Sequence, residues 1–231
     1  MVAMVQCYFD FLKTDDLYNS CYFIDDCNKY AYDILINRWP NWFCNGILLC
    51  ASPGGGKTHL GMLWAKKTNA FVVSRENIVN LSNDFNCLSV GSPVLIDSIS
   101  SMMDTQECLL HLYNKITELG LHSVWLANFG ELNNLSIVDF KSRLMMLDLI
   151  TIGNPGDEII AKILHQKLFN SGLRISDRVF DYIVKRMPRS FASVCAISSH
   201  VNHLVSISGH NPSILEVDSV LNWRNSGHGS C

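Results

Sequence analysis

The sequence has little charge of either sign and no excess of basic residues. Asp, Glu, Lys and Arg make up 17% of its 231 residues, and the formal net charge is −3. We therefore expect no sequence-independent DNA binding, which needs a basic surface. No apolar run approaches the roughly 18 residues of a membrane-spanning helix. The first residues also lack the basic start and apolar core of a signal peptide. These absences favour a cytoplasmic protein that spans no membrane.

The cysteines form no CxxC pair. There are nine of them, an odd number scattered along the chain, so neither a disulfide framework nor a zinc site is indicated. Hydrophobic residues make up 48% of the sequence, which is typical of a globular protein rather than a disordered one. The length permits one large domain or two small ones.

Residues 46–60, GILLCASPGGGKTHL, have the form of a P-loop. An apolar strand is followed by a Gly-rich turn, a Lys-Thr pair and apolar residues at helical spacing. The glycines let backbone N–H groups turn toward a polyphosphate, and the following helix presents its positive end to the same anion. Lys57 supplies a charge for the β- and γ-phosphates, and Thr58 a hydroxyl for Mg²⁺. Ala51 stands where the motif usually has its first Gly.

A second strand-like segment, residues 94–97, ends in Asp97 about forty residues after the P-loop. This is the Walker B form, in which the acid orders Mg²⁺. Many ATPases carry a second acid next, to orient the attacking water, but here the next residue is Ser98, which is no carboxylate base. We therefore expect weak hydrolysis or none by the chain alone. Asn128, at the end of a later strand, fits either a sensor of the γ-phosphate or a turn residue.

Strand-like and helical patterns alternate up to residue 152. We expect helices at 28–38 and from a capping-box-like Asp104 and Glu107 to Gly120, and strands at 47–50, 71–73, 94–97, 122–127 and 149–152. This alternation predicts an α/β fold with a parallel sheet and helices on both faces. After Gly153, four apolar helical patterns predict a small all-helical domain. The expected domains are residues 1–14, 15–152 and 153–231.

Residues 6–11, QCYFDF, place Gln6 ahead of two spaced aromatics, Phe9 and Phe11. An extended segment with two apolar anchors suits docking into a pocket of a partner. An edge strand that packs on the chain's own core is the alternative from the pattern alone.

The motifs GGGKTHL, VLID, DFKSRL and PRSF resemble those of the DnaA-related AAA+ proteins, with a P-loop base domain and a helical lid. Within that group the chain is most similar to the Hda-type regulatory inactivators of the DnaA initiator. Ser98 and the residues from Gln6 to Phe11 fit that type, and the segments YFIDDCNKYAYDIL and RWPNW resemble the linker of its alphaproteobacterial members. Since the sequence ends at Cys231, we expect no C-terminal DNA-binding domain and no direct sequence-specific DNA binding. We also expect no DnaA-type N-terminal domain.

The resemblance implies a role for each matching residue. Phe23 and Ile24 match the linker that lies near the adenine. Asp97 matches the acid that orders Mg²⁺ together with Thr58. Arg189 matches the lid arginine that reaches the phosphates. Arg143 matches the arginine finger, which acts in trans on the nucleotide of a neighbouring subunit. Gln6, Phe9 and Phe11 match the peptide that binds the DNA polymerase sliding clamp. The implied residues for the phosphates of ADP or ATP are Ser52, Pro53, Gly54, Gly55, Gly56, Lys57, Thr58, His59 and Asn128.

Three functions follow as hypotheses. The first is a negative regulator of replication initiation that binds the sliding clamp and stimulates ATP hydrolysis by DnaA through Arg143. The second is a self-contained ATPase, such as a helicase-loader-like factor, which the intact Lys57, Thr58 and Asp97 support and Ser98 opposes. The third is a nucleotide-gated adaptor without catalysis. Assembly with further copies of the chain stays open, as does the choice between ADP and ATP.

Overall fold

A computed structural model describes residues 22–42, 44–83, 88 and 91–225 of the chain. The chain divides into two compact units. The first contains the chain up to Ser52 together with Gly56–Ile152, and the second contains Pro53–Gly55 and the chain from Gly153 onward. The expected N-terminal peptide, residues 1–14, lies outside the described residues.

The first unit is built on a five-stranded sheet with the order β2-β3-β4-β1-β5. Every pair of neighbouring strands is parallel. The predicted parallel sheet is therefore confirmed, with strands close to the expected segments. They are β1 (Gly46–Ala51), β2 (Phe71–Val73), β3 (Val94–Ile96), β4 (Ser123–Asn128) and β5 (Asp148–Ile152).

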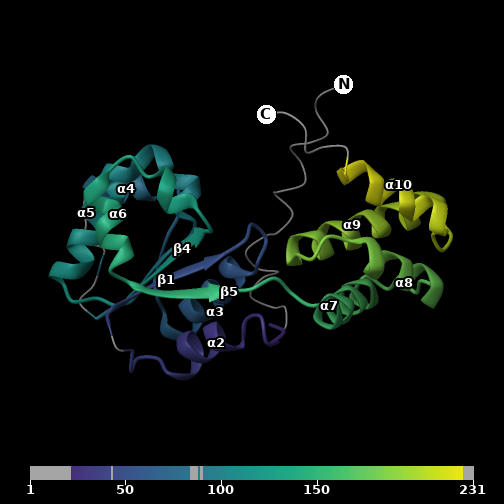
Figure 1. The fold of residues 1–231 in the computed structure, drawn as a ribbon, viewed down its shortest axis with the longest axis horizontal. Coiled ribbons are helices and arrows are strands. Elements are labelled where there is room, and N and C mark those ends of the chain that lie inside the picture. The colour runs from purple at the N-terminus through teal and green to yellow at the C-terminus, as the bar shows by residue number, and fades with distance from the viewer. Residues whose placement is uncertain (1–21, 43, 84–87, 89–90, 226–231) are drawn as a thin grey trace. The chain divides into compact units, whose positions relative to one another are not determined.

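Helices cover both faces of this sheet (Figure 1). On one face lie α2 (Lys29–Tyr32), its continuation as a π-helix (Asp33–Asn37) and α3 (Lys57–Thr68). On the other face lie α4 (Ile78–Asn83), α5 (Gln106–Glu118) and α6 (Val138–Met145). Two 3₁₀ segments, Ile99–Thr105 and Glu131–Asn134, follow β3 and β4.

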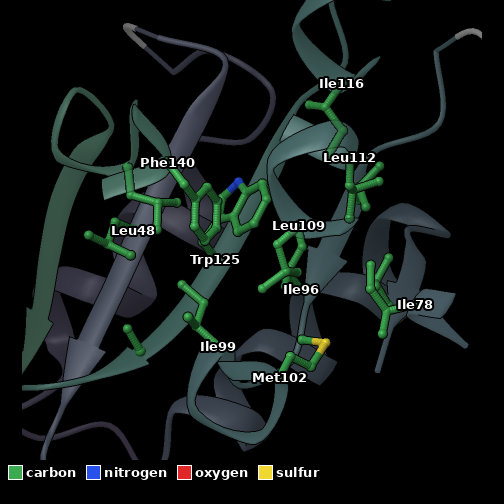
Figure 2. Packing of buried hydrophobic residues seen from close by; sticks show 14 of the residues in the cluster. Leu48, Ile78, Ile96, Ile99, Met102, Leu109, Leu112, Ile116, Trp125 and Phe140 are labelled. Carbon is green, nitrogen blue, oxygen red and sulfur yellow. The ribbon is translucent and has the colours of Figure 1, made fainter. Parts of the chain in front are cut away.

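The three central strands, β1, β3 and β4, are almost wholly apolar because they are buried on both faces, whereas the edge strand β5 exposes three of its five side chains. In β1, Leu48 faces the side of α5 and α6, whereas Leu49 faces α3. Trp125 of β4 is fully buried, and its ring lies 5.9 Å from that of Phe140 on α6. Figure 2 shows Trp125 at the centre of this packing, close to Leu109 of α5. This two-sided core fixes the carboxyl ends of the strands, where the P-loop and the Walker B acid lie.

The helix expected at 28–38 is present over residues 29–37, although it is a regular α-helix only from Lys29 to Tyr32 and then widens into a π-helix. Another local prediction was wrong. The capping box does not form, because Thr105 is the N-cap of α5 and its side chain makes no capping bond. The carboxylate of Asp104 instead accepts a hydrogen bond from Arg75 over 2.8 Å.

The second unit is helical, as predicted. Its helices are α7 (Asp157–Asn170), α8 (Asp177–Arg186), α9 (Phe191–Ser208) and α10 (Ile214–Asn225). They share an apolar core that includes Ile160, Ile183 and Val194. Ser190 caps α9, since its hydroxyl accepts a hydrogen bond from the N–H of Ser193 over 3.1 Å. Within the described part of the chain, no helix combines the length and the apolar character needed to span a bilayer.

Candidate functional site

The P-loop sequence forms the turn that the motif predicts between β1 and α3. Gly56 is the N-cap of α3 and has a φ of 89°, a left-handed conformation that favours glycine. Helix α3 begins at the next residue, Lys57, so its first N–H groups have no partner within the helix. The local sequence thus produces a helix N-terminus of the kind that binds anions.

Lys57 is nearly buried, with 8% of its surface exposed. Its ammonium group donates to the carbonyl oxygens of Ala51 and Ser52 over 3.3 and 3.1 Å. A third hydrogen bond, of 2.5 Å, goes to Oδ1 of Asn128. Burial lowers the pKa of Lys57, and the charge of Glu131 is the largest of the effects that oppose this.

Thr58 and Asp97 are brought together from α3 and the end of β3. The threonine hydroxyl donates to Oδ1 of Asp97 over 3.1 Å. Burial raises the pKa of Asp97, while the bond from Thr58 and the charge of Lys57 act in the opposite direction. A carboxylate and a hydroxyl are thus held side by side in a poorly solvated place.

Ser98, which follows the acid, has a φ of 69°, which is unusual for a residue other than glycine. Its carbonyl oxygen accepts hydrogen bonds from the N–H and the hydroxyl of Ser101, over 3.1 and 2.8 Å. Strained backbone of this kind costs about 1–3 kcal/mol and is concentrated at functional sites. The chain therefore turns sharply directly after Asp97.

Glu131 is a residue of this site that the sequence analysis did not identify. One carboxylate oxygen accepts from the backbone N–H of Asn128 over 2.7 Å, and the other accepts from the side-chain Nδ2 of Asn128. The only signal in the sequence is a carboxylate three residues after a strand-end Asn, a pattern too common to identify a site.

The segment before α2 lies beside the first turn of α3. The rings of Tyr22 and His59 meet edge to face at 5.1 Å, and Tyr22 stacks on Tyr32 at 5.7 Å. Asn28, which is buried, donates from its side chain to the carbonyl oxygen of Phe23, and Ile24 is half exposed. This arrangement brings Tyr22, which the motifs did not single out and which directly precedes the predicted linker residues, to the P-loop helix.

Arg189 lies in the second unit. Its guanidinium group donates to the carbonyl oxygens of Val184 and Met187, over 2.7 and 3.3 Å, and forms an ion pair of 2.6 Å with Asp157. These contacts fix the side chain between α8 and the start of α7. Contact between Arg189 and the phosphates remains a prediction.

Arg143 lies on α6, where it forms an ion pair with Asp139 over 3.1 Å and its guanidinium carbon is 5.9 Å from the centre of the Tyr113 ring. Large apolar side chains are also exposed on α6, just after it, just after β4 and in β5: Phe129, Val138, Met145, Met146 and Leu149. Some of them line a pocket of about 200 Å³ with Lys141. Contiguous exposed apolar surface is typical of a contact surface. The predicted role of Arg143 in trans is not tested by these contacts, and Gln6, Phe9 and Phe11 lie outside the described residues.

Comparisons with known proteins establish the fold. Searches against protein-family models and against curated proteins found no match. Domain III of the Thermotoga maritima replication initiation protein DnaA matches with a TM-score of 0.69 and 15% identity, over 87% of this chain and 93% of that one. AMPPCP-bound DnaA from Aquifex aeolicus matches with a TM-score of 0.65 and 20% identity, over 94% and 72% of the two chains. The RuvB Holliday junction branch migration motor of Thermotoga maritima matches with a TM-score of 0.63 and 16% identity, over 87% of this chain and 70% of that one. The chain therefore has the fold of AAA+ P-loop proteins.

Proposed function

We propose that this chain is a DnaA-related AAA+ protein that binds an adenine nucleotide with Mg²⁺ and regulates replication initiation. The observation that carries the proposal is the convergence of Lys57, Thr58, Asp97 and Asn128 at the N-terminus of α3. A cation, a hydroxyl, a carboxylate and an amide at a helix N-terminus form the set of groups with which P-loop proteins bind a polyphosphate.

The same groups support a polyphosphate as the ligand. Lys57 donates to three oxygens of the protein. A phosphate oxygen that binds Lys57 therefore only has to take the place of one of these acceptors. The solved DnaA of Aquifex aeolicus holds AMPPCP, an ATP analogue, which supports an adenine nucleotide for this chain. The linker at Phe23 and Ile24 would contact the adenine, and Arg189 of the second unit would contribute to binding of the phosphates.

The residues present fit Mg²⁺. The hydroxyl of Thr58 and the carboxylate of Asp97 are hard oxygen ligands 3.1 Å apart. Mg²⁺ usually takes one or two protein oxygens in such sites and fills its other positions with phosphate oxygens and water. When bound, it would neutralise phosphate charge at this place. Thr58 and Asp97 would hold it, and Lys57 would bind the phosphates beside it.

The finer part of the proposal is that the chain acts on another protein's nucleotide. Ser98 leaves the Walker B strand without a second acid, so the chain's own hydrolysis is expected to be slow. Arg143 lies on a helix that exposes the large apolar side chains of Val138 and Met145, which favours a role at a contact with another subunit. In this proposal Gln6, Phe9 and Phe11 tether the chain to the sliding clamp, and Arg143 then stimulates ATP hydrolysis by a DnaA initiator, which inactivates it.

Two measurements test the proposal. Identification of the nucleotide released on denaturing the purified protein, together with calorimetric titration of ADP and ATP with Mg²⁺, tests binding. Single-turnover hydrolysis of ATP by a DnaA initiator, with and without this chain, the clamp and DNA, tests regulation. Turnover by the chain alone would favour the self-contained ATPase. Binding of nucleotide and initiator without stimulated hydrolysis would favour the adaptor.

A further inference from the structure

Arg75 joins the turns that follow two neighbouring strands, β2 and β3. One guanidinium nitrogen donates to the carbonyl oxygen of Ser101 over 3.0 Å, and the other donates to the carboxylate of Asp104 over 2.8 Å. Ser101 in turn donates from its N–H and its hydroxyl to the carbonyl oxygen of Ser98. Because Ser98 directly follows Asp97, a continuous chain of hydrogen bonds runs from the guanidinium group to the neighbour of the Walker B acid.

The same two turns are also joined at the backbone. The N–H of Asp97 donates to the carbonyl oxygen of Val73, the last residue of β2, over 2.9 Å. The side chain of Asn77 holds the turn after β2 in place, since it accepts from the N–H of Ser74 and donates to a carbonyl oxygen within that strand. Arg75 therefore belongs to a turn that is fixed to the sheet beside the acid.

The 3₁₀ segment that Arg75 contacts follows a strained residue. Ser98 has a φ of 69°, and conformations of this kind persist only where surrounding contacts hold them. On the inner side of the segment, Ile99 and Met102 are fully buried, and Figure 2 shows both within the apolar packing. On the outer side, the two hydrogen bonds from Arg75 hold the segment. The conformation directly after the Walker B acid thus depends on both sides.

We propose that Arg75 is a positioning residue for the candidate Mg²⁺ site and acts through the turn after β3 on the carboxylate of Asp97. While Arg75 holds the turn, this carboxylate keeps the orientation in which it accepts from Thr58. Without Arg75, Ser98 relaxes toward a commoner backbone conformation, and the carboxylate spends less time beside the hydroxyl of Thr58. The inference rests on the proposed nucleotide binding and adds a residue that tunes the contribution of Mg²⁺ to it.

The exposure of Arg75 makes this role separable from a contribution to stability. The side chains of Arg75 and Asp104 are 62% and 60% exposed. Ion pairs this exposed contribute little to the free energy of unfolding. Groups that orient a metal ligand from outside the coordination sphere, in contrast, typically change metal affinity by about 10–100-fold. Removal of Arg75 should therefore weaken Mg²⁺ binding and leave the stability of the fold unchanged.

The test compares the affinity for ADP with Mg²⁺ and with EDTA, titrated calorimetrically into the full chain. In Arg75→Ala, we expect the gain in affinity that Mg²⁺ provides to fall about tenfold. The affinity in EDTA should stay within about twofold, because the P-loop is untouched. The thermal midpoint of the chain without nucleotide should be unchanged. Arg75→Lys should lose most of the gain as well, since an ammonium group does not reproduce the paired contacts of a planar guanidinium group.

Ser101→Ala is the second variant, and it decides the question even if Arg75→Ala does not fold. It removes the hydroxyl that donates to Ser98 and keeps the arginine, so the gain from Mg²⁺ should fall here too. The double variant should lose little more than Arg75→Ala, because both substitutions break the same chain of hydrogen bonds. Arg38→Ala is the matched control, since it removes a similarly exposed arginine that pairs with Asp33, and it should keep the full gain.

The possible failures of the two proposals are distinguishable. A wild-type gain from Mg²⁺ in Arg75→Ala and Ser101→Ala would overturn the role of Arg75, while nucleotide binding stands. Equal losses of affinity with Mg²⁺ and with EDTA would also overturn it, since they would indicate general damage to the site. ADP binding by the wild-type chain without any gain from Mg²⁺ would overturn this inference alone. No binding of ADP by the wild-type chain in either condition would overturn the proposed function as well.

Discussion

The hydroxyl of Thr58 donates a hydrogen bond of 3.1 Å to the carboxylate of Asp97, 39 positions later in the chain. Thr58 belongs to the first turn of α3, and Asp97 directly follows β3. In the sheet, β4 lies between β3 and the strand that leads into the P-loop. The bond therefore depends on the parallel arrangement of three strands, which brings their carboxyl ends to one edge.

Asp97→Asn should weaken Mg²⁺ binding without lowering the stability of the fold. Because burial raises the pKa of Asp97, its charge is unfavourable in the folded chain without a cation. The neutral Asn should therefore leave the thermal midpoint unchanged or raise it. At the same time, the gain in ADP affinity that Mg²⁺ provides should fall by about tenfold or more. Calorimetric titrations with Mg²⁺ and with EDTA measure this gain. An undiminished Mg²⁺ effect in the variant would exclude Asp97 as a ligand.

Lys57→Ala should abolish stabilisation by nucleotide. ADP with Mg²⁺ at a hundred times its Kd is expected to add about 2.7 kcal/mol to the free energy of unfolding of the wild-type chain. The variant lacks the ammonium group that donates to Ala51, Ser52 and Asn128 and that would bind the phosphates, so its midpoint should not respond. Lys66→Ala, an exposed lysine on the same helix, is the control and should respond like the wild type. Identical responses of all three proteins would mean that the P-loop does not bind nucleotide.

Because β1 is buried on both faces and β5 is not, two chemically identical substitutions in these strands should differ greatly in their effect on the free energy of unfolding. Leu48 of β1 is 2% exposed and packs near Trp125 and Phe140, as Figure 2 shows. Leu149 of β5 is 61% exposed. Leu48→Ala should cost about 2–5 kcal/mol, because it removes buried methyl groups and leaves a cavity. Leu149→Ala should change stability by no more than about 0.5 kcal/mol. Urea unfolding measures both, and equal losses would contradict the assigned faces.

The sequence predicts the sheet well because a parallel strand buried on both faces is a short apolar run with turn residues beside it. Lys57, Thr58 and Asp97 are predictable for a similar reason, since their spacing follows from the strands that carry them. Asp104 shows where local patterns fail: the pairing with Arg75, 29 positions away, outweighs the capping box. Glu131 could not be predicted, because a carboxylate three residues after a strand-end Asn is too common a pattern to identify a site. The fold of the 3₁₀ segment, rather than any motif, brings it to Asn128.

The N-terminal peptide predicts a tether that is separable from the nucleotide site. Replacing Phe9 and Phe11 together by Ala should abolish binding to the sliding clamp, since each lost aromatic anchor costs about 2 kcal/mol or more. Nucleotide affinity should be unchanged. Surface plasmon resonance on immobilised clamp measures the first effect and calorimetry the second. Clamp affinity equal to that of the wild type would mean that Phe9 and Phe11 do not anchor the chain to the clamp.

The last prediction concerns Arg143, on which the regulatory proposal depends. Phosphoryl transfer needs charge stabilisation on the γ-phosphate oxygens, and an arginine provides it with a planar group that stays charged and makes paired hydrogen bonds. Arginine fingers contribute about 10³–10⁵ in rate, so the loss of one is easily measured. Arg143→Ala should therefore fail to stimulate single-turnover hydrolysis of initiator-bound ATP in the presence of clamp and DNA. Arg143→Lys should fail nearly as completely, because it keeps the charge but not the planar fork.

The contacts of Arg143 indicate how to separate this role from a structural one. In the described structure its side chain pairs with Asp139 on the exposed side of α6, and an exposed pair at this spacing contributes only about 0.3–0.5 kcal/mol to stability. Asp139→Ala, which breaks the same pair but keeps the arginine, is therefore the matched control and should retain stimulation. Both variants should keep the wild-type fold, nucleotide affinity and clamp affinity. If Arg143→Ala stimulates hydrolysis as well as the wild type does, the mechanism in trans is wrong and the adaptor becomes the better proposal. If Asp139→Ala fails in the same way as Arg143→Ala, stimulation of hydrolysis depends on the ion pair and not on the guanidinium group alone.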